Sequence, residues 1–344
     1  MYKPILHFAM KFNIYDDPEE RKLQRVPVPV MGGFVVFSGA IVSSLCYWFV
    51  NDCVSVAPVQ VAMLFMLLVG FLDDMRNLSP YMKLVIELVV VVALALVNGY
   101  LIDNFHGLWG IYELSPWIAW PLTVFACVGI INAINMIDGI DGLSSGICIM
   151  ILTFYTWMFI ACGDEVHAVL CGCVVGSLIP FFVMNVFGQK SKMFIGDSGT
   201  LMLGILICDI VMSILTTDSI CSVKLSGRPY CLPAFVLAAL AIPVFDALRV
   251  IFARIWRGRS PFRPDKSHLH HAFIGYGFRH LETALLEIIL NMLVIMLVFV
   301  LSRSHLPMEW QLYGVVLAGF AVTFVLFWLL GRRYRIAKRN QKEK

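Results

Sequence analysis

Charged residues are scarce in this sequence. They make up 14% of its 344 residues, while 60% are hydrophobic and the mean hydropathy is +0.83. Soluble domains carry charge on about a quarter of their residues, so this scarcity excludes an ordinary soluble protein and indicates an integral membrane protein. The apolar runs have the length of helices and do not alternate every second residue, which excludes a membrane β-barrel.

The chain also lacks the cysteine spacings of common metal and redox motifs. None of its ten cysteines forms a C-x-x-C pair, and most lie inside apolar runs, where a thiol acts as a small buried hydrophobe. Cys221 and Cys231 fall in one predicted external loop, so they can pair if that side of the membrane is oxidising. We expect no cleavable signal peptide, separate soluble domain or internal repeat.

Ten apolar runs are long enough to cross a membrane as helices. They lie near residues 33–50, 57–72, 82–100, 117–134, 144–162, 166–184, 199–216, 232–253, 283–301 and 311–330. The sequence therefore predicts an all-α polytopic membrane protein with about ten transmembrane helices. It has a cytoplasmic or interfacial segment at 1–32, a polytopic domain at 33–330 and a basic cytoplasmic tail at 331–344.

The distribution of positive charge predicts the orientation of these helices. Only Lys224, Arg228 and Arg303 fall in the loops on one side, which leaves 23 of the 26 lysines and arginines for the other side. Because cytoplasmic loops carry the excess of lysine and arginine, that other side is predicted to be cytoplasmic. Every motif rich in acids or histidines lies in a loop on the same side, so we expect an active site at the inner membrane face.

The stretch from Asn132 to Leu143 is a polar, glycine-bearing segment between two apolar runs. Asn135, Asp138 and Asp141 follow one another at spacings of three, and the glycines among them make a continuous helix unlikely to persist. Amides and acids at the edge of a membrane helix are costly, so a functional site is the favoured interpretation. The alternative is an Asx-rich turn that caps the next helix.

Asp73 and Asp74 form a second acidic group, followed by the cations Arg76 and Lys83. Magnesium binds through one or two carboxylates together with phosphate oxygens, so adjacent aspartates suit a diphosphate site. The two cations suit a lipid phosphate at the headgroup level. The alternative is a solvated charged turn that follows the distribution of positive loops.

Asp197 lies between Gly196 and Gly199, in a segment that begins at Asn185. The glycines leave room for a phosphate or a metal to approach the backbone. The alternative is that Asp197 is the N-cap residue of the following helix.

Three histidines within four residues, His268, His270 and His271, belong to the densest polar patch of the chain, with Arg249 and Arg263 nearby. Their spacing matches no structural zinc motif. Hydrogen bonding to sugar and phosphate oxygens is favoured over zinc binding, with the arginines neutralising a diphosphate. Together the motifs favour metal-dependent phosphoryl transfer between a soluble nucleotide and a lipid phosphate. A transporter fits less well, since transporter sites lie near the bilayer midplane.

Four motifs carry a resemblance to a known superfamily: Phe71-Leu-Asp-Asp74, Asn135-Met-Ile-Asp-Gly-Ile-Asp-Gly-Leu143, Gly196-Asp-Ser-Gly199 and His268-Leu-His-His271. With these motifs in this order, the chain resembles the bacterial polyprenyl-phosphate N-acetylhexosamine-1-phosphate transferases, a superfamily of multi-pass inner-membrane enzymes with a cytoplasmic active site. The resemblance implies that UDP-N-acetylglucosamine and undecaprenyl phosphate give undecaprenyl-diphosphate-N-acetylglucosamine and UMP, with Mg²⁺ or Mn²⁺ as cofactor. Lipid I synthesis and a non-enzymatic lipid-linked sugar transporter remain the alternatives. The family usually has eleven spans, so the first span is expected to be missing here.

The resemblance also implies roles for individual residues. It assigns catalysis to Asp73, Asp74, Asp138 and Asp141. It assigns the metal to Asp197, with Asp73 as a second contact. It assigns recognition of the nucleotide and sugar to Asn135, Asn185, Arg249, Arg263, His268, His270 and His271. It assigns the lipid phosphate to Arg76 and Lys83.

Direct attack of the lipid phosphate on the UDP-sugar is favoured over a two-step route through an aspartyl phosphate. The expected partners are the two substrates and membrane lipids but no nucleic acid, and a homodimer stays open.

Overall fold

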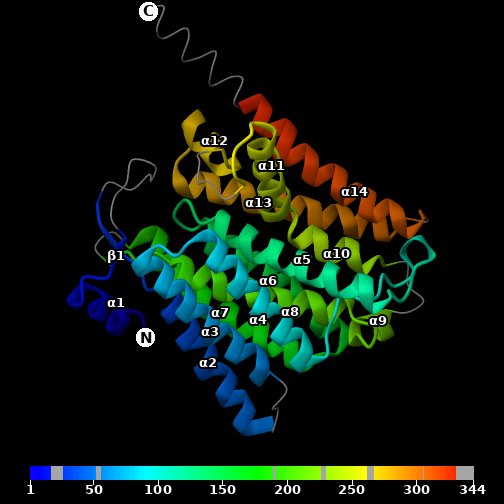
Figure 1. Cartoon of the computed structure of the whole chain (residues 1–344), viewed down its shortest axis with the longest axis horizontal. Helices are drawn as coiled ribbons and strands as arrows, with labels where there is room; N and C mark the ends of the chain where they lie inside the picture. The colour runs from blue at the N-terminus through cyan, green and yellow to red at the C-terminus, as the bar shows by residue number, and fades with distance from the viewer. Residues whose placement is uncertain are drawn as a thin grey trace, which may run out of the picture.

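Helices make up nearly all of the structure, which confirms the predicted all-α class (Figure 1). The computed structural model describes residues 1–16, 26–51, 56–188, 191–225, 230–261, 267–304 and 306–330. Arg263 and the basic tail at 331–344 lie outside the described residues. The elements are α1 (Tyr2–Lys11), β1 (Tyr15–Asp16), β2 (Val28–Pro29), α2 (Gly32–Asn51), α3 (Ala57–Arg76), α4 (Pro80–Asn98), η1 (Leu108–Gly110), α5 (Pro116–Met136), α6 (Leu143–Cys162), α7 (Glu165–Phe187), α8 (Gly196–Leu215), α9 (Ile220–Leu225), α10 (Leu232–Ala239), α11 (Ala241–Trp256), α12 (Leu269–Tyr276), α13 (His280–Ser302), α14 (Met308–Phe320) and η2 (Ala321–Val325).

Within the described residues, eight helices are each long and apolar enough to cross a membrane. They are α3, α4, α5, α6, α7, α8, α13, and α14 with its continuation to Leu330. The bent pair α10 and α11 makes a ninth if it is counted as one span. The predicted first span falls on α2, of which Gly32–Leu45 forms an apolar stretch. The chain is therefore a multi-pass membrane protein.

Helix α8 lies at the centre of the bundle. Its most apolar 18-residue window is 100% buried, and it packs against α2, α3 and α5. The contact with α3 is close because of Gly70, where a side chain would collide with the backbone of Asp197 and Ser198. Small residues let membrane helices approach in this way. The close contact sets the end of α3, with its two aspartates, beside the first turn of α8.

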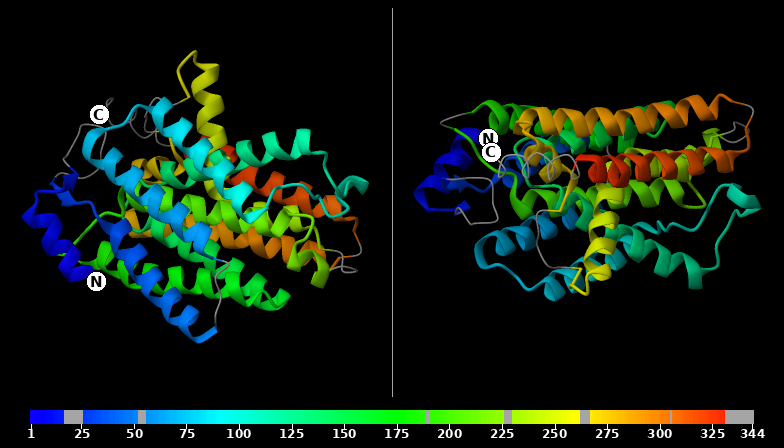
Figure 2. Two further views of the ribbon diagram at one scale, coloured as in Figure 1. Left: turned by 60° about the horizontal axis from the view of Figure 1, so that its bottom comes forward. Right: turned by 90° about the horizontal axis from the view of Figure 1, so that it is seen from above.

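The stretch predicted as a span at 232–253 is not one straight helix. The chain breaks between α10 and α11, which meet at 75°, and Figure 2 shows α11 projecting from the bundle. Pro243 lacks the N–H that would bond the carbonyl of Ala239 in a continuous helix. The amide of Asn291 in α13 fills this need from outside, since it donates to the carbonyls of Ala238 and Ala239 at 3.1 Å each and accepts the N–H of Ile242 at 2.8 Å. A break inside a membrane is stable only when neighbouring helices satisfy the freed backbone groups.

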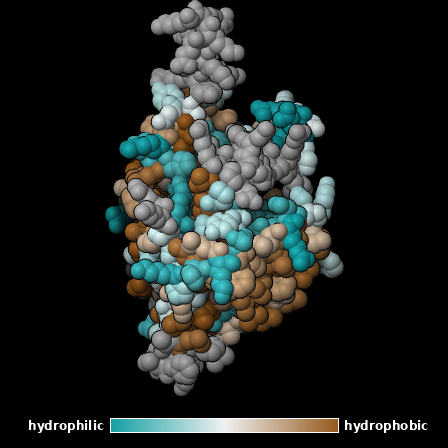
Figure 3. Space-filling view, turned by 90° about the vertical axis from the view of Figure 1, so that its left-hand side faces the viewer, coloured by the Kyte–Doolittle hydropathy of each residue, from teal (hydrophilic) through white to brown (hydrophobic). Residues whose placement is uncertain are grey.

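The N-terminal segment packs across one end of the bundle. Strands β1 and β2 pair antiparallel, and Val30 bridges to Phe194 just before α8. The hydroxyl of Tyr2 in α1 donates to the carbonyl of Ser191 at 2.6 Å. Figure 3 looks onto this end and shows hydrophilic residues gathered over its middle, with hydrophobic residues beside and below them. A polar end of this kind is where a water-soluble substrate can reach a membrane protein.

Candidate active site

Helix ends that meet at this end of the bundle enclose a cavity of about 1120 Å³. Helices α3 and α5 end there, while α4, α6 and α8 begin there. The cavity brings together most of the residues singled out from the sequence: Asp73, Asp74, Lys83, Asn135, Asp138, Asp141, Asn185, Asp197, His268, His270 and His271. Motifs that are far apart in the chain therefore share one site, as the loop placement predicted.

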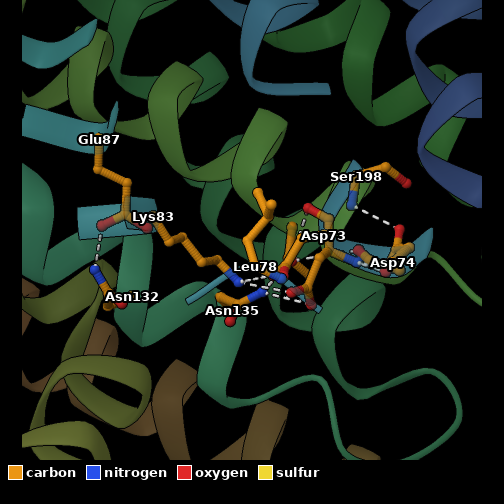
Figure 4. A network of polar contacts seen from close by, with 11 residues as sticks. Asp73, Asp74, Leu78, Lys83, Glu87, Asn132, Asn135 and Ser198 are labelled. Carbon is orange, nitrogen blue, oxygen red and sulfur yellow. Dashed lines mark hydrogen bonds and ion pairs between the residues drawn. The ribbon is translucent and has the colours of Figure 1, made fainter. Parts of the chain in front are cut away.

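Lys83 in the first turn of α4 joins two of the acidic motifs. Its ammonium lies 2.6 Å from Asp73 Oδ2 and 2.6 Å from Asp197 Oδ2 (Figure 4). The other oxygen of Asp73 accepts the backbone N–H of Leu78 at 2.7 Å. Because two carboxylates share one ammonium, this group of three side chains keeps one negative charge, which attracts a further cation.

Asn135 in the last turn of α5 holds the free side of Asp197. Its amide donates to Asp197 Oδ1 at 2.9 Å and to the hydroxyl of Thr200 at 2.9 Å. Asp197 lies in the first turn of α8, which begins at Gly196, and Ile195 occupies the N-cap position. The alternative interpretation of Asp197 as the N-cap is therefore wrong. Its carboxylate instead points into the cavity, where α3, α4, α5 and α8 meet.

Asp74, and not Asp197, caps the N-terminus of α8. Its two oxygens accept the backbone N–H groups of Asp197 at 2.9 Å and of Ser198 at 3.1 Å. These N–H groups lie at the start of α8, where the partial positive charge of the helix favours an anion. Gly196 has a φ of +70°, and a side chain there would collide with the Asp74 carboxylate. Asp74 thus positions Asp197 from a neighbouring helix.

Asp138 and Asp141 lie in the turn between α5 and α6, as the glycine pattern predicted. Burial raises the pKa of Asp138 to about 7, although its carboxylate accepts a hydrogen bond from Ser144 at 2.6 Å. Burial alone would also raise the pKa of Asp141, but His280 at 2.9 Å and Lys192 at 2.7 Å outweigh it and hold that pKa below its usual value. At neutral pH the turn therefore holds one firmly ionised carboxylate and one that readily takes up a proton.

The histidine cluster is anchored by Asp246 of α11. One oxygen of Asp246 lies 2.8 Å from His268 Nδ1, and the other lies 2.6 Å from the Arg249 guanidinium and accepts the N–H of Leu269. His270 packs against Gly139, where any side chain would collide with the imidazole ring. This contact joins the histidine cluster to the turn that holds Asp138 and Asp141.

The His270 ring is held neutral in the buried wall of the cavity. Burial, together with the neighbouring His271 and His268, holds the pKa of His270 well below its usual range. Its Nδ1 atom is buried and has no hydrogen-bond partner among the described residues. A neutral imidazole with a free ring nitrogen suits a hydrogen bond to a sugar or phosphate group.

Three predicted site residues either lie outside the cavity or support the backbone of its wall. Arg76 is exposed at the end of α3 and does not line the cavity. Arg249 is buried below the histidine cluster, where it binds Asp246 and donates to the carbonyl of Ser267. Asn185 lines the cavity, but its amide accepts the N–H of Gly142 and donates to the carbonyl of Met193. The structure thus gives Arg249 and Asn185 supporting positions.

Several residues that complete the site carry no predicted role. Glu87 is buried within α4 and accepts a hydrogen bond from Asn132, which lines the cavity. His280 at the start of α13 pairs with Asp141. A lone carboxylate inside a predicted span was a usable signal for Glu87, since intramembrane acids mark functional sites. An isolated histidine such as His280 carries no comparable signal in sequence.

The donor atoms of the cavity suit a hard cation. Asp73 and Asp197 offer carboxylate oxygens on the adjacent helices α3 and α8. Among the residues described, there is no group of three or more His, Cys, Asp or Glu side chains placed to hold a metal. Magnesium needs only one or two carboxylates when phosphates and water complete its shell. Two aspartates fit such a partial site, and Lys83 beside them suits a phosphate.

Comparison with known proteins gives a consistent result. A sequence model of glycosyl transferase family 4 matches residues 56–216. The chain is 28% identical to the undecaprenyl-phosphate alpha-N-acetylglucosaminyl 1-phosphate transferase of Yersinia pestis, over 96% of this chain and 87% of the relative. It is 29% identical to the protein of the same name from Haemophilus influenzae, over 96% of this chain and 91% of the relative. The similarity to these relatives therefore extends well beyond the matched family region.

Proposed function

We propose that this chain, which matches the model of glycosyl transferase family 4 over residues 56–216, transfers N-acetylglucosamine 1-phosphate from UDP-N-acetylglucosamine to undecaprenyl phosphate, releasing UMP. The transfer is the first membrane step of a cell-surface glycan pathway. The active site faces the cytoplasm from the bacterial inner membrane. The names of the relatives support the acceptor and the sugar, and the excess of lysine and arginine in the loops on this side supports the orientation.

One observation carries the proposal: acids, cations and histidines from separate loops line a single cavity at one end of a membrane bundle. The same cavity also includes apolar residues such as Leu84, Leu88 and Phe125 on α4 and α5. A lipid phosphate needs an apolar wall next to charged groups, and a nucleotide sugar needs an aqueous entrance. The cavity offers both, which a simple transporter gate does not require.

We assign Mg²⁺ to Asp197 and Asp73, with Asn135 holding Asp197 in position. When bound, the ion supplies charge that neutralises the diphosphate and the departing UMP. Asp74 acts through Asp197, because both of its oxygens are used on the backbone of α8. Lys83, in the first turn of α4, provides a positive charge for the acceptor phosphate. The cavity thus pairs each phosphate with a cationic or hydrogen-bonding group.

The chain promotes the reaction mainly by holding two anions together. An oxygen of the lipid phosphate bonds to the sugar-linked phosphorus, and the bond from that phosphorus to the UMP oxygen breaks. The acceptor phosphate is already an anion, so it needs positioning more than deprotonation. Neutral His270 and the ionised Asp141–Lys192 pair hold the sugar and nucleotide in this scheme. Direct attack leaves no phosphate bound to an aspartate.

The reaction is tested with purified full-length protein in detergent, undecaprenyl phosphate, Mg²⁺ and a panel of UDP-sugars. We expect UMP and a lipid-diphosphate-N-acetylglucosamine, both abolished by a chelator. A product from UDP-MurNAc-pentapeptide alone would instead support lipid I synthesis. Absence of UMP with every donor would refute the enzymatic proposal.

A matched pair of variants on α8 tests the metal assignment. Asp197→Asn should abolish turnover, whereas Asp209→Asn should retain it. Asp209 lies on the same helix and is more deeply buried than Asp197, but its carboxylate accepts a hydrogen bond from Asn98 and does not line the cavity. Wild-type turnover in the Asp197 variant, or equal loss in both variants, would contradict the assignment.

A further inference from the structure

Two cysteines meet at the end of the bundle opposite the cavity. Helices α6 and α8 both begin at the cavity, so Cys162 at the end of α6 and Cys221 in α9, which follows α8, lie at the far end. Figure 1 shows α9 at the end away from α12 and β1. Helix α9 packs against α6, and this packing brings the side chains of the two cysteines together. Each cysteine is only 1% exposed, so the protein holds the two sulfur atoms together inside its packing.

The structure thus favours a different partner for Cys221 from the one that loop position suggested. Cys231 precedes α10, and its backbone N–H donates to the side chain of Gln311. The Cys221 thiol instead lies beside Cys162, which is 59 positions earlier in the chain. A pairing between segments so distant was not accessible from sequence.

Another close pair of cysteines provides a comparison within the same molecule. Cys208 of α8 donates its thiol to the carbonyl of Cys127 in α5 at 3.2 Å, and both residues are fully buried. These residues lie within their helices rather than at helix ends. A soluble oxidant has no path to them, whereas Cys162 and Cys221 lie next to the loops of the far end. Proximity and burial are common to both pairs, and the position of Cys162 and Cys221 at helix ends beside the loops distinguishes them.

We propose that Cys162 and Cys221 form a disulfide bond that ties the end of α6 to the segment between α8 and α10. The proposal rests on the membrane orientation proposed above and not on the transferase activity. With the cavity facing the cytoplasm, the far end faces the extracytoplasmic side, where disulfides form and persist. The bond closes a long loop that contains α7 and α8, so it restrains the unfolded chain and fastens the far ends of helices that build the cavity.

The oxidation is a thiol–disulfide exchange with an extracytoplasmic disulfide carrier. One cysteine thiolate attacks a sulfur of the carrier disulfide, forms a mixed disulfide and releases one carrier thiol. The second thiolate then attacks the sulfur of the first cysteine, so that the protein disulfide forms and the second carrier thiol leaves. The two protein thiols lose two electrons and two protons, and the carrier disulfide gains them.

Differential alkylation of the full-length chain tests this proposal. Cells are acid-quenched and denatured in N-ethylmaleimide, so that free thiols are blocked before air can oxidise them. The purified protein is then digested, with or without reduction and labelling by a heavy-isotope maleimide, and mapped by mass spectrometry. We expect a peptide pair joined through Cys162 and Cys221 in most molecules, and heavy label on both residues only after reduction. Cys127 and Cys208 should carry the first label.

Serine variants provide the matched controls. Cys221→Ser should leave Cys162 with the first label, and Cys208→Ser should leave the joined peptide unchanged. First label on both Cys162 and Cys221 in the wild-type chain would overturn the proposal, as would a peptide that joins Cys221 to Cys231. The wild-type map decides the matter even if a variant fails to accumulate. UMP release is measured separately, so failure of the transferase proposal is distinguishable from failure of this one.

Discussion

Replacing Asn291 with leucine should displace the histidine cluster without touching it. Asn291 holds three backbone groups at the break between α10 and α11: the N–H of Ile242 and the carbonyls of Ala238 and Ala239. Leucine is similar in size to asparagine but neither donates nor accepts a hydrogen bond. The variant therefore leaves these groups without their present partners inside an apolar environment.

The expected loss follows from the three hydrogen bonds. Hydrogen bonds between membrane helices are worth about 0.6 kcal/mol on average and up to about 1.7 kcal/mol. Three of them amount to about 2–5 kcal/mol of stability on the same scale. Helix α11 starts at the break and carries Asp246, which holds His268. If about 1.4 kcal/mol of the loss affects substrate binding, the KM for the UDP-sugar rises about tenfold.

The assay combines thermal unfolding in detergent with UMP release at varied UDP-sugar concentration. Ser302→Ala is the matched control, because the hydroxyl of Ser302 donates within α13 itself, to the carbonyl of Phe299. The double variant Asn291→Leu with Pro243→Ala regains a donor for the Ala239 carbonyl, so it should recover stability while keeping the raised KM. An Asn291 variant with wild-type melting temperature and KM would refute the reasoning and assign the bend to packing alone.

Three further predictions concern the cavity. The pKa of Asp138 is about 7 in the fold against an ordinary value of 3.8, so the folded chain keeps a proton that the unfolded chain has lost. Stability should therefore fall as the pH rises between these values, and melting curves of Asp138→Asn should lack that slope. Gly139→Ala forces a methyl group against the His270 ring. If the overpacking cost of about 1–3 kcal/mol falls on substrate binding, the KM for the UDP-sugar rises about 5- to 150-fold. An unchanged KM would show that the ring moves aside. Lys83→Met leaves Asp73 and Asp197 without their shared ammonium, which should cost about 3–5 kcal/mol of folding stability. Added Mg²⁺ should therefore raise the melting temperature of this variant more than that of the wild type. An equal rise would argue against metal binding by these acids.

The sequence predicted the general architecture because its signals are local. Long apolar runs set the helices, and glycines ended α5 before Asp138 as expected. The convergence of the acidic motifs followed from their common side of the membrane. A multi-pass helical protein with one polar end was therefore predictable from composition and loop order alone.

The details that escaped prediction depend on contacts between distant segments. The break at α10 and α11 is stable because of Asn291, 48 positions beyond Pro243. A proline alone does not distinguish a kinked span from a broken one. Asp73 and Asp74 look equivalent in sequence, yet one pairs with Lys83 and the other caps α8, because Gly70 brings these helices into contact. Such roles come from packing, which local patterns do not encode.

The central position of α8 has a consequence for how the chain is built. Of the helices that enclose it, α2, α3, α4, α5 and α6 are all synthesised earlier. When α8 is synthesised, these five helices already precede it in the chain, so α8 can pack against protein and not against lipid. This order explains how the most enclosed helix can carry the acids Asp197 and Asp209. Asp197 meets Lys83 and Asn135, and Asp209 meets Asn98, so neither acid is left against hydrocarbon, where an ionised side chain is costly.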